Sequence, residues 1–150
     1  MTDGASAVVE RFWAALYDRD WPRIRSFFDA DSIYYDVPTG PATAARGPEG
    51  IEARLRLGLE GLAGYEHQPG LLAVGADGVV LTEHTEVWHW RTGETVALPF
   101  VSVQRVRGDT IELWKDYWDY ATLINGAPPW WVEEIMAADL PWLFDATGMA

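Results

Sequence analysis

Apolar residues in the first third of the chain recur at three- and four-residue steps, the spacing that places them on one face of a helix. The first run passes through Val8, Phe12 and Leu16, and the stretch 18–21 breaks the pattern. Pro22 suits the first turn of a short second helix. The pattern predicts these two helices, an extended segment at 32–37, and a third helix.

The third helix is expected to open at Gly47-Pro48-Glu49, and the same periodicity continues after it. Its apolar face would carry four residues: Ile51, Leu55, Leu59 and Leu62. The preceding segment, 38–47, is rich in proline, glycine and alanine and is typical of a loop.

The second half of the chain alternates between extended runs and turn sequences. Three long runs are rich in β-branched and aromatic residues: 79–90, 95–106 and 110–119. Turns such as Arg107-Gly108-Asp109 separate them, and this spacing is typical of an antiparallel meander. A further strand over 70–74 is expected to lead into it.

Helices followed by an antiparallel sheet predict an α+β fold. Because one flat sheet cannot bury both faces of such long strands, we expect a strongly curved, mixed or antiparallel sheet. It would pack on the three N-terminal helices around a cone-shaped interior. The chain has no internal repeat and no linker, and its 150 residues are about the length of one domain. We therefore predict a single domain over 1–150.

Residues 125–150 form an apolar C-terminal extension, with a helix expected over 130–138. Three roles are open to it: packing on the outer face of the sheet or against a second copy, covering the mouth of a cavity as a lid, or membrane association. Acidic residues in the extension disfavour the membrane role: Glu133, Glu134, Asp139 and Asp145.

Composition excludes several classes of function. The formal net charge of −12 argues against binding nucleic acid or an anionic membrane. The absence of cysteine excludes disulfides, thiolate metal sites and cysteine nucleophiles. Because we find neither a signal peptide nor an apolar run of the ~20 residues that a membrane span needs, we expect a cytoplasmic protein. Nine tryptophans are the other unusual feature of the composition.

Strand parity suggests where chemistry could lie, since residues two apart share a face. In two of the runs, one face mixes ionisable groups with large aromatic rings: His84, Glu86 and Trp88 in 79–90, and Trp114, Asp116 and Trp118 in the last run. Tyr34 and Asp36 share a parity in the early strand and could complete the cluster. The carboxylates could equally lie on a solvated face and the tryptophans in a core, so parity alone leaves both interpretations open.

The sequence resembles a known superfamily and, in three further segments, one branch of that superfamily. Three segments resemble the opening of the nuclear transport factor 2-like superfamily: Phe12-Trp13-Ala14-Ala15-Leu16, Asp20-Trp21 and Phe27-Phe28-Asp29-Ala30-Asp31. Three others resemble the limonene-1,2-epoxide hydrolase branch of that superfamily: Tyr34-Tyr35-Asp36-Val37-Pro38, Leu81-Thr82-Glu83-His84-Thr85-Glu86-Val87 and Trp114-Lys115-Asp116-Tyr117-Trp118-Asp119. The resemblance extends to about Leu123 and implies the cone-shaped, cystatin-like α+β fold.

The resemblance also implies roles for the clustered residues. In that family a carboxylate activates water for one-step addition to an epoxide, and a second carboxyl protonates the oxygen. By position, Asp116 would be the general base, Tyr34 and Asp36 would hold the water, and Glu86 would be the acid. His84 stands where the family has an arginine that bridges the carboxyls, Glu86 replaces an aspartate, and Asp36 replaces an asparagine.

Two other functions remain open on the same residues. Isomerases that resemble ketosteroid isomerase, and SnoaL-like polyketide cyclases, use acid and base groups on this fold without adding water. A non-catalytic module that binds a small ligand is the third reading, and it would be favoured if His84, Glu86 and Asp116 were far apart or faced solvent.

We expect a hydrophobic small-molecule substrate and a homodimer formed through the outer face of the sheet. The pocket walls should come from five residues: Trp88, Leu98, Phe100, Trp118 and, from the third helix, Leu62. No cofactor and no metal are expected. His84 and His89 have opposite strand parity, so they should not share a metal ion.

Overall fold

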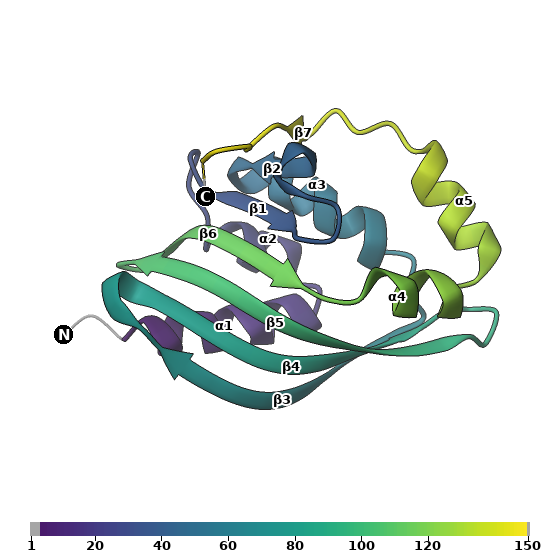
Figure 1. The fold of residues 1–150 in the computed structure, drawn as a ribbon, viewed down its shortest axis with the longest axis horizontal. Helices are drawn as coiled ribbons and strands as arrows, with labels where there is room; N and C mark the ends of the chain where they lie inside the picture. The colour runs from purple at the N-terminus through teal and green to yellow at the C-terminus, as the bar shows by residue number, and fades with distance from the viewer. Residues whose placement is uncertain (1–3, 150) are drawn as a thin grey trace.

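Residues 4–149, which the computed structural model describes, form a curved seven-stranded sheet with helices on its concave side (Figure 1). The elements before the meander are α1 (Ala5–Tyr17), α2 (Trp21–Arg25), β1 (Ile33–Asp36), η1 (Pro41–Thr43), β2 (Ala44–Arg46) and α3 (Gly47–Leu59). The remainder are β3 (Gly64–Val74), η2 (Ala76–Gly78), β4 (Val79–His89), β5 (Thr95–Arg107), β6 (Thr110–Tyr117), α4 (Tyr120–Gly126), α5 (Pro129–Ala137) and β7 (Leu143–Phe144). The α+β prediction is confirmed.

The three N-terminal helices form where the apolar periodicity predicts them. The buried face of α1 includes Val8, Phe12 and Leu16, which are at most 1% exposed. At the start of α2, the Asp20 side chain accepts a hydrogen bond from the backbone N–H of Arg23, and proline occupies the first turn. This packing fixes α1 against the sheet, where its last residues reach the interior.

The sheet order is β3-β4-β5-β6-β1-β2-β7. The meander β3 to β6 is antiparallel, as predicted, while β1 runs parallel to β6 and makes the sheet mixed. This parallel pairing sets Asp36 directly beside Asp116. Ser102 of β5 pairs with Asp116 on the other side. Side chains from three strands therefore meet at one level of the sheet.

Some predicted boundaries were wrong. The strand expected at 70–74 begins at Gly64, and the expected loop 38–47 contains η1 and β2. The last long strand ends at Tyr117 because Asp119 accepts a hydrogen bond from the Thr122 backbone N–H and caps α4. The two-residue β7 and three-residue β2 are too short to show a period in sequence.

The C-terminal extension does not lie on the outer face of the sheet. From α4 the chain passes through α5 and returns across the molecule to β7, which pairs with β2 (Figure 1). Trp131 of α5 is 6% exposed. Its ring packs edge-on against Trp88 of β4 and against Trp90, which directly follows that strand. The extension therefore covers the interior that the curved sheet leaves open.

Burial along β4 alternates as the parity argument predicts, with the even-numbered residues 80–88 facing inward. The opposite face of the sheet exposes several large apolar side chains: Leu81, Val101 and Tyr117. A homodimer through this face stays a prediction. Within residues 4–149, no helix combines the length and hydropathy needed to span a membrane.

Candidate active site

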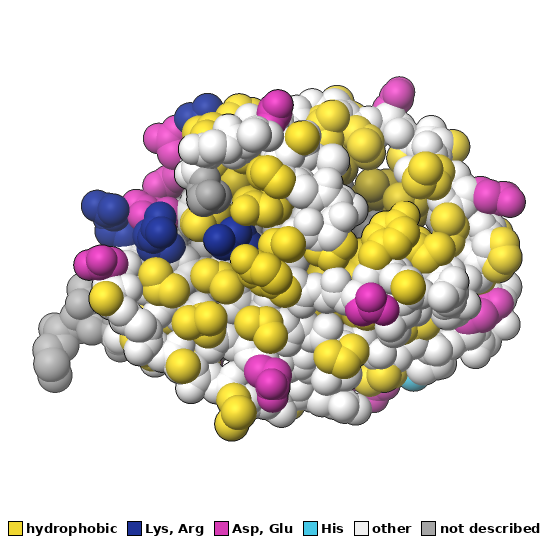
Figure 2. Space-filling view, viewed as in Figure 1, with side chains coloured by type: hydrophobic (Ala, Val, Ile, Leu, Met, Phe, Trp, Pro, Cys, Tyr) yellow, Lys and Arg dark blue, Asp and Glu magenta, His cyan; other side chains and the backbone are white. Residues whose placement is uncertain are grey.

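A cavity of about 450 Å³ lies between the concave face of the sheet, α3 and the C-terminal extension. Figure 2 shows apolar side chains around the hollow between this extension and the rest of the molecule. Most of its lining is aliphatic or aromatic, and three carboxyl groups reach it: Asp36 from β1, Glu86 from β4 and Asp116 from β6. The expected cluster of ionisable groups is thus gathered on the wall of an apolar cavity.

Most of the expected pocket walls line this cavity: Trp88, Leu98, Phe100 and Trp118. Leu62 does not, and its assignment to the wall was wrong. Because α3 ends at Leu59, the chain turns before Leu62, whose side chain is buried in the core and whose carbonyl accepts a hydrogen bond from Arg19. Gly58 and Leu59 of α3 line the cavity instead.

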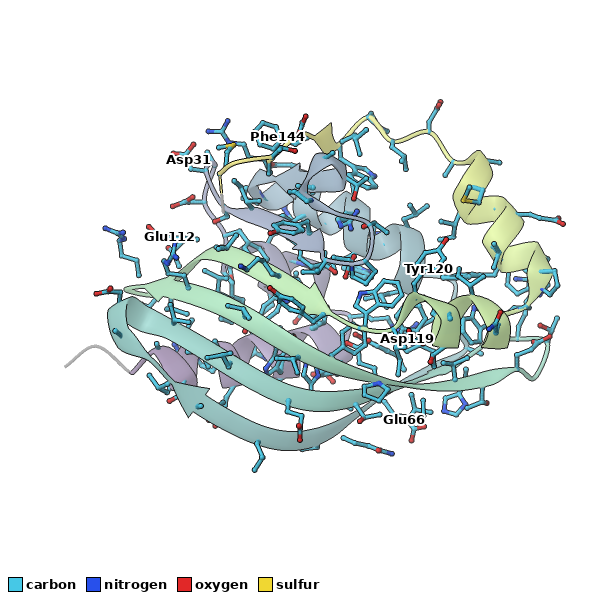
Figure 3. The ribbon with its side chains drawn as sticks, viewed as in Figure 1. Asp31, Glu66, Glu112, Asp119, Tyr120 and Phe144 are labelled. Carbon is cyan, nitrogen blue, oxygen red and sulfur yellow. The ribbon has the colours of Figure 1, made fainter. Side chains whose placement is uncertain are left out.

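The C-terminal extension supplies another wall of the cavity. Trp131, Ile135 and Trp142 line it, and Tyr120 at the start of α4 (labelled in Figure 3) stacks on Trp118 with ring centroids 6.1 Å apart. Of the roles left open by the sequence, the structure shows the covering one.

Asp116 is almost completely buried, with 3% of its surface exposed. Its Oδ1 accepts two hydrogen bonds of 2.6 Å, from the Ser102 hydroxyl and the Trp114 indole N–H. Burial raises the pKa of Asp116 well above its usual value, the negative charge of Asp36 adds to this, and the hydroxyl and indole donors oppose it. Asp116 is therefore a stronger base than an exposed carboxylate.

Glu86 is 4% exposed and is held by hydrogen-bond donors on both oxygens. Its Oε1 accepts from Tyr65 at 2.8 Å and Tyr17 at 3.0 Å, and its Oε2 accepts from the Trp88 indole at 2.8 Å. Burial raises the pKa of Glu86 to about 7, although these donors partly oppose the shift. A large fraction of Glu86 is therefore protonated at neutral pH.

Asp36 and Tyr34 lie together on β1. The Tyr34 hydroxyl donates to Asp36 Oδ1 at 3.1 Å, and the Trp118 indole donates to the same oxygen at 2.9 Å. Arg54 of α3 forms a 2.7 Å ion pair with Asp36 Oδ2 and lies over the ring of Tyr34. This guanidinium balances the charge of one carboxylate beside the two others.

His84 does not contact the carboxyls directly, as the family resemblance implied that it would. Among the described residues, its nitrogens hydrogen-bond the hydroxyls of Ser102 (2.8 Å, Nε2) and Tyr17 (3.1 Å, Nδ1), and these hydroxyls contact Asp116 and Glu86. Burial lowers the pKa of His84 to about 3, and neighbouring His67 adds to this. A neutral ring that is separated from each acid by one hydroxyl cannot replace the charge of an arginine.

Sequence reasoning missed four polar residues of the site: Tyr17, Arg54, Tyr65 and Ser102. Two of them left a signal. Ser102 shares strand parity with Leu98 and Phe100, which makes it a polar residue on a buried face. Arg54 lies one helical turn after Ile51, beside the apolar stripe of α3.

Exposure or wide separation of His84, Glu86 and Asp116 would have favoured a passive binding module. The structure instead buries all three side chains to 4% exposure or less. Within residues 4–149, no three His, Cys, Asp or Glu side chains are placed to hold a metal ion. The chemistry that these residues themselves offer is proton transfer by carboxyl groups in an apolar cavity.

Comparisons with known proteins agree with this architecture. One solved structure that resembles the chain is an M. tuberculosis LEH-like epoxide hydrolase, with 25% identity and a TM-score of 0.68 over 89% of this chain and 92% of that one. A protein from Shewanella putrefaciens CN-32, named for a SnoaL-like polyketide cyclase, has a TM-score of 0.72 at 17% identity, over 81% of this chain and 84% of that one.

A protein of ketosteroid isomerase-like fold from Catenulispora acidiphila, solved with trimethylamine, has a TM-score of 0.66 at 22% identity over 79% of this chain and 90% of that one. These two likenesses, both below 25% identity, show a shared fold alone. No curated protein sequence matches the chain. The model of the SnoaL-like domain family matches residues 9–114, and the chain belongs to this family.

Proposed function

We propose that this protein adds water to an epoxide carried by a hydrophobic small molecule, with Asp116 as general base and Glu86 as general acid. The observation that carries the proposal is the pair of buried carboxyls, both with raised pKa values, on the wall of an apolar cavity. An acid and a base that stay available at neutral pH are what this chemistry requires.

The reaction balances with these groups alone. Asp116 takes a proton from a water molecule positioned by Tyr34 and Asp36, and the water oxygen bonds to an epoxide carbon. The carbon–oxygen bond of the ring breaks, its electron pair stays on oxygen, and Glu86 supplies the proton that this oxygen needs. The product is a vicinal diol, and the enzyme is left with a protonated Asp116 and an ionised Glu86.

Glu86 is longer by one methylene than the aspartate at the acid position of the epoxide hydrolase family. Misplacing a catalytic group by ~1 Å can cost about a hundredfold in rate. Here Tyr17, Tyr65 and Trp88 donate to its two oxygens, and they hold the longer side chain in one position. The 25% identity to the LEH-like epoxide hydrolase over 89% of the chain supports the same reaction class.

A second candidate is isomerisation or cyclisation by the same two carboxyls. The apolar cavity covered by the C-terminal extension favours it, because proton transfer between two sites on a substrate needs no water. The SnoaL-like family to which the chain belongs gives its name to polyketide cyclases among the structural neighbours.

Turnover in oxygen-18 water separates these two reactions. If the protein hydrolyses an epoxide, mass spectrometry of the product will show one heavy oxygen per diol, since the attacking oxygen comes from water. The screen should include terpene, fatty and aromatic epoxides, with the same substrates incubated without enzyme as the control. A product that forms at the enzymatic rate without the label would contradict hydrolysis and support the second candidate.

The substitution Trp142→Ala should weaken substrate binding more than it slows chemistry. Trp142 lines the cavity, and the Arg54 guanidinium lies 5.3 Å from its ring. Losing this apolar wall and its cation–π contact should raise KM about fivefold. We expect kcat to change by less than about threefold, since Trp142 is not in the acid and base pair.

Trp130→Ala is the matched control for this measurement. The Trp130 indole stacks on Arg91 at 3.7 Å and donates to Thr92, and it is not part of the cavity lining. Its removal should leave KM unchanged. Equal effects of the two substitutions on KM would show that the extension acts only through stability.

A further inference from the structure

A continuous chain of hydrogen bonds connects the two proposed catalytic carboxyls behind the cavity wall. Asp116 Oδ1 lies 2.6 Å from the Ser102 hydroxyl, which lies 2.8 Å from His84 Nε2. On the other side of the ring, His84 Nδ1 lies 3.1 Å from the Tyr17 hydroxyl, which lies 3.0 Å from Glu86 Oε1. Each member can both give and receive a proton.

The neutral imidazole makes this chain directional. With a pKa of about 3, His84 carries one proton, so one ring nitrogen donates and the other accepts. If Nε2 donates to Ser102, Ser102 donates to Asp116, which must then be ionised. Nδ1 then accepts the single hydroxyl proton of Tyr17, so Tyr17 no longer donates to Glu86 in this state. The 3.0 Å hydrogen bond between them is reversed, and Glu86 Oε1 donates its proton to Tyr17. The chain is complete only when one carboxyl is ionised and the other protonated.

We propose that Ser102, His84 and Tyr17 form a proton relay that returns the proton taken up by Asp116 to Glu86 inside the protein after each turnover. This inference rests on the roles of the two carboxyls given above. It adds three positioning residues that act through the acid and the base without touching the substrate.

The relay step balances without any outside reactant. Protonated Asp116 gives its proton to the Ser102 oxygen, and Ser102 passes its own proton to His84 Nε2. His84 releases its Nδ1 proton to Tyr17, and Tyr17 passes its own proton to Glu86. Four O–H or N–H bonds break and four form. The net charge is unchanged, and the result is the ionised base and protonated acid that the next turnover needs.

The carboxyls do not need this chain to be hydrogen-bonded. Trp114 already donates to Asp116, and Tyr65 and Trp88 already donate to Glu86. Ser102 and His84 do not line the cavity, so they cannot hold substrate there. Burying a histidine, a serine and two acids in one row is costly unless every group is satisfied, and here the row is satisfied end to end.

The first experiment breaks the relay at Ser102. Ser102→Ala should lower kcat by at least about tenfold and change KM by less than about twofold, because proton return must then wait for solvent. Ser102→Thr keeps the hydroxyl and should stay within about threefold of wild type. Thr82→Val is the matched control. Thr82 pairs with Ser102 across the strands, and its buried hydroxyl has no hydrogen-bond partner among the described residues, so its loss should leave kcat unchanged.

The second experiment needs no turnover. Carbon-13 NMR of the Glu86 carboxyl gives the pH at which this group titrates. Asp116→Ala should lower that pH by at least about one unit, because it removes both a negative charge and the end of the relay. In a Ser102→Ala background the same substitution removes only the charge, so the change should be less than half as large. The other ionisable groups around Glu86 are the same in both backgrounds: Tyr17, Tyr65, His67, His84, Asp36 and Arg54.

The outcomes separate the relay from the proposed reaction. A kcat loss in Ser102→Ala that Ser102→Thr restores, together with the smaller Glu86 change, supports the relay. An equal Glu86 change in both backgrounds shows that the carboxyls interact only through space, and the relay is overturned. If wild type turns over no epoxide, the proposed function fails, and the titration still decides the relay.

Discussion

Asp116→Asn is expected to reduce kcat/KM for any accepted epoxide by about a thousandfold, within the range that a general base contributes. The amide keeps an oxygen that can accept from Ser102 and Trp114, so the substitution preserves shape and both hydrogen bonds. What it removes is the ability to take a proton from water. Steady-state kinetics with the best substrate of the epoxide screen would measure the loss.

Unfolding must be excluded as the cause of that loss. Because burial raises the pKa of Asp116, this carboxyl favours folding most at low pH, and the contribution is lost as pH rises through its folded-state pKa. At neutral pH the folded variant buries a neutral amide where wild type buries an ionised carboxylate. The free energy of unfolding of the variant in urea should therefore be at least as large as that of wild type. An inactive variant with wild-type stability supports the base, and an unchanged turnover would refute it.

The meander and the first helix could be predicted from sequence because their patterns are long. The run 79–90 places His84, Glu86 and Trp88 on one face by alternation alone, and burial in β4 follows it. The pairing of β1 with β6 could not be predicted. β1 has only four residues, and no short turn joins it to β6, so the sequence does not show which residues of the two strands pair. That pairing is what sets Asp36 beside Asp116.

The site was predictable only as far as strand parity and resemblance reach. Both place Asp116, Glu86 and Tyr34 inside, whereas Tyr17 and Arg54 come from helices whose docking is a tertiary property. The family resemblance implied that His84 takes the place of an arginine. The structure surrounds it with hydroxyls instead, because Ser102 on the neighbouring strand lies between it and Asp116. Such partners depend on cross-strand register, which sequence alone does not contain.

Glu86→Gln is expected to lower kcat/KM by about two to three orders of magnitude, since an amide can donate a hydrogen bond but cannot transfer a proton. In wild type, kcat/KM should fall as pH rises through about 7, the pKa of the buried Glu86, because only the protonated acid can serve the leaving oxygen. This alkaline fall should be absent from the residual activity of the variant. A variant that keeps the same fall with pH would assign it to another group.

The same carboxyl should make stability depend on pH, whether or not the protein turns over an epoxide. The pKa of Glu86 rises from 4.5 to about 7 on folding, so its protonated form favours the folded state below pH 4.5. That contribution is lost as pH rises through about 7, because the unfolded chain ionises first, and the full loss is about 3 kcal/mol. Between pH 4.5 and 7.5 the urea unfolding free energy of Glu86→Gln should therefore rise by about this amount relative to wild type. A pH-independent difference between the two proteins would mean that Glu86 is ionised in the folded state at neutral pH and cannot be the acid.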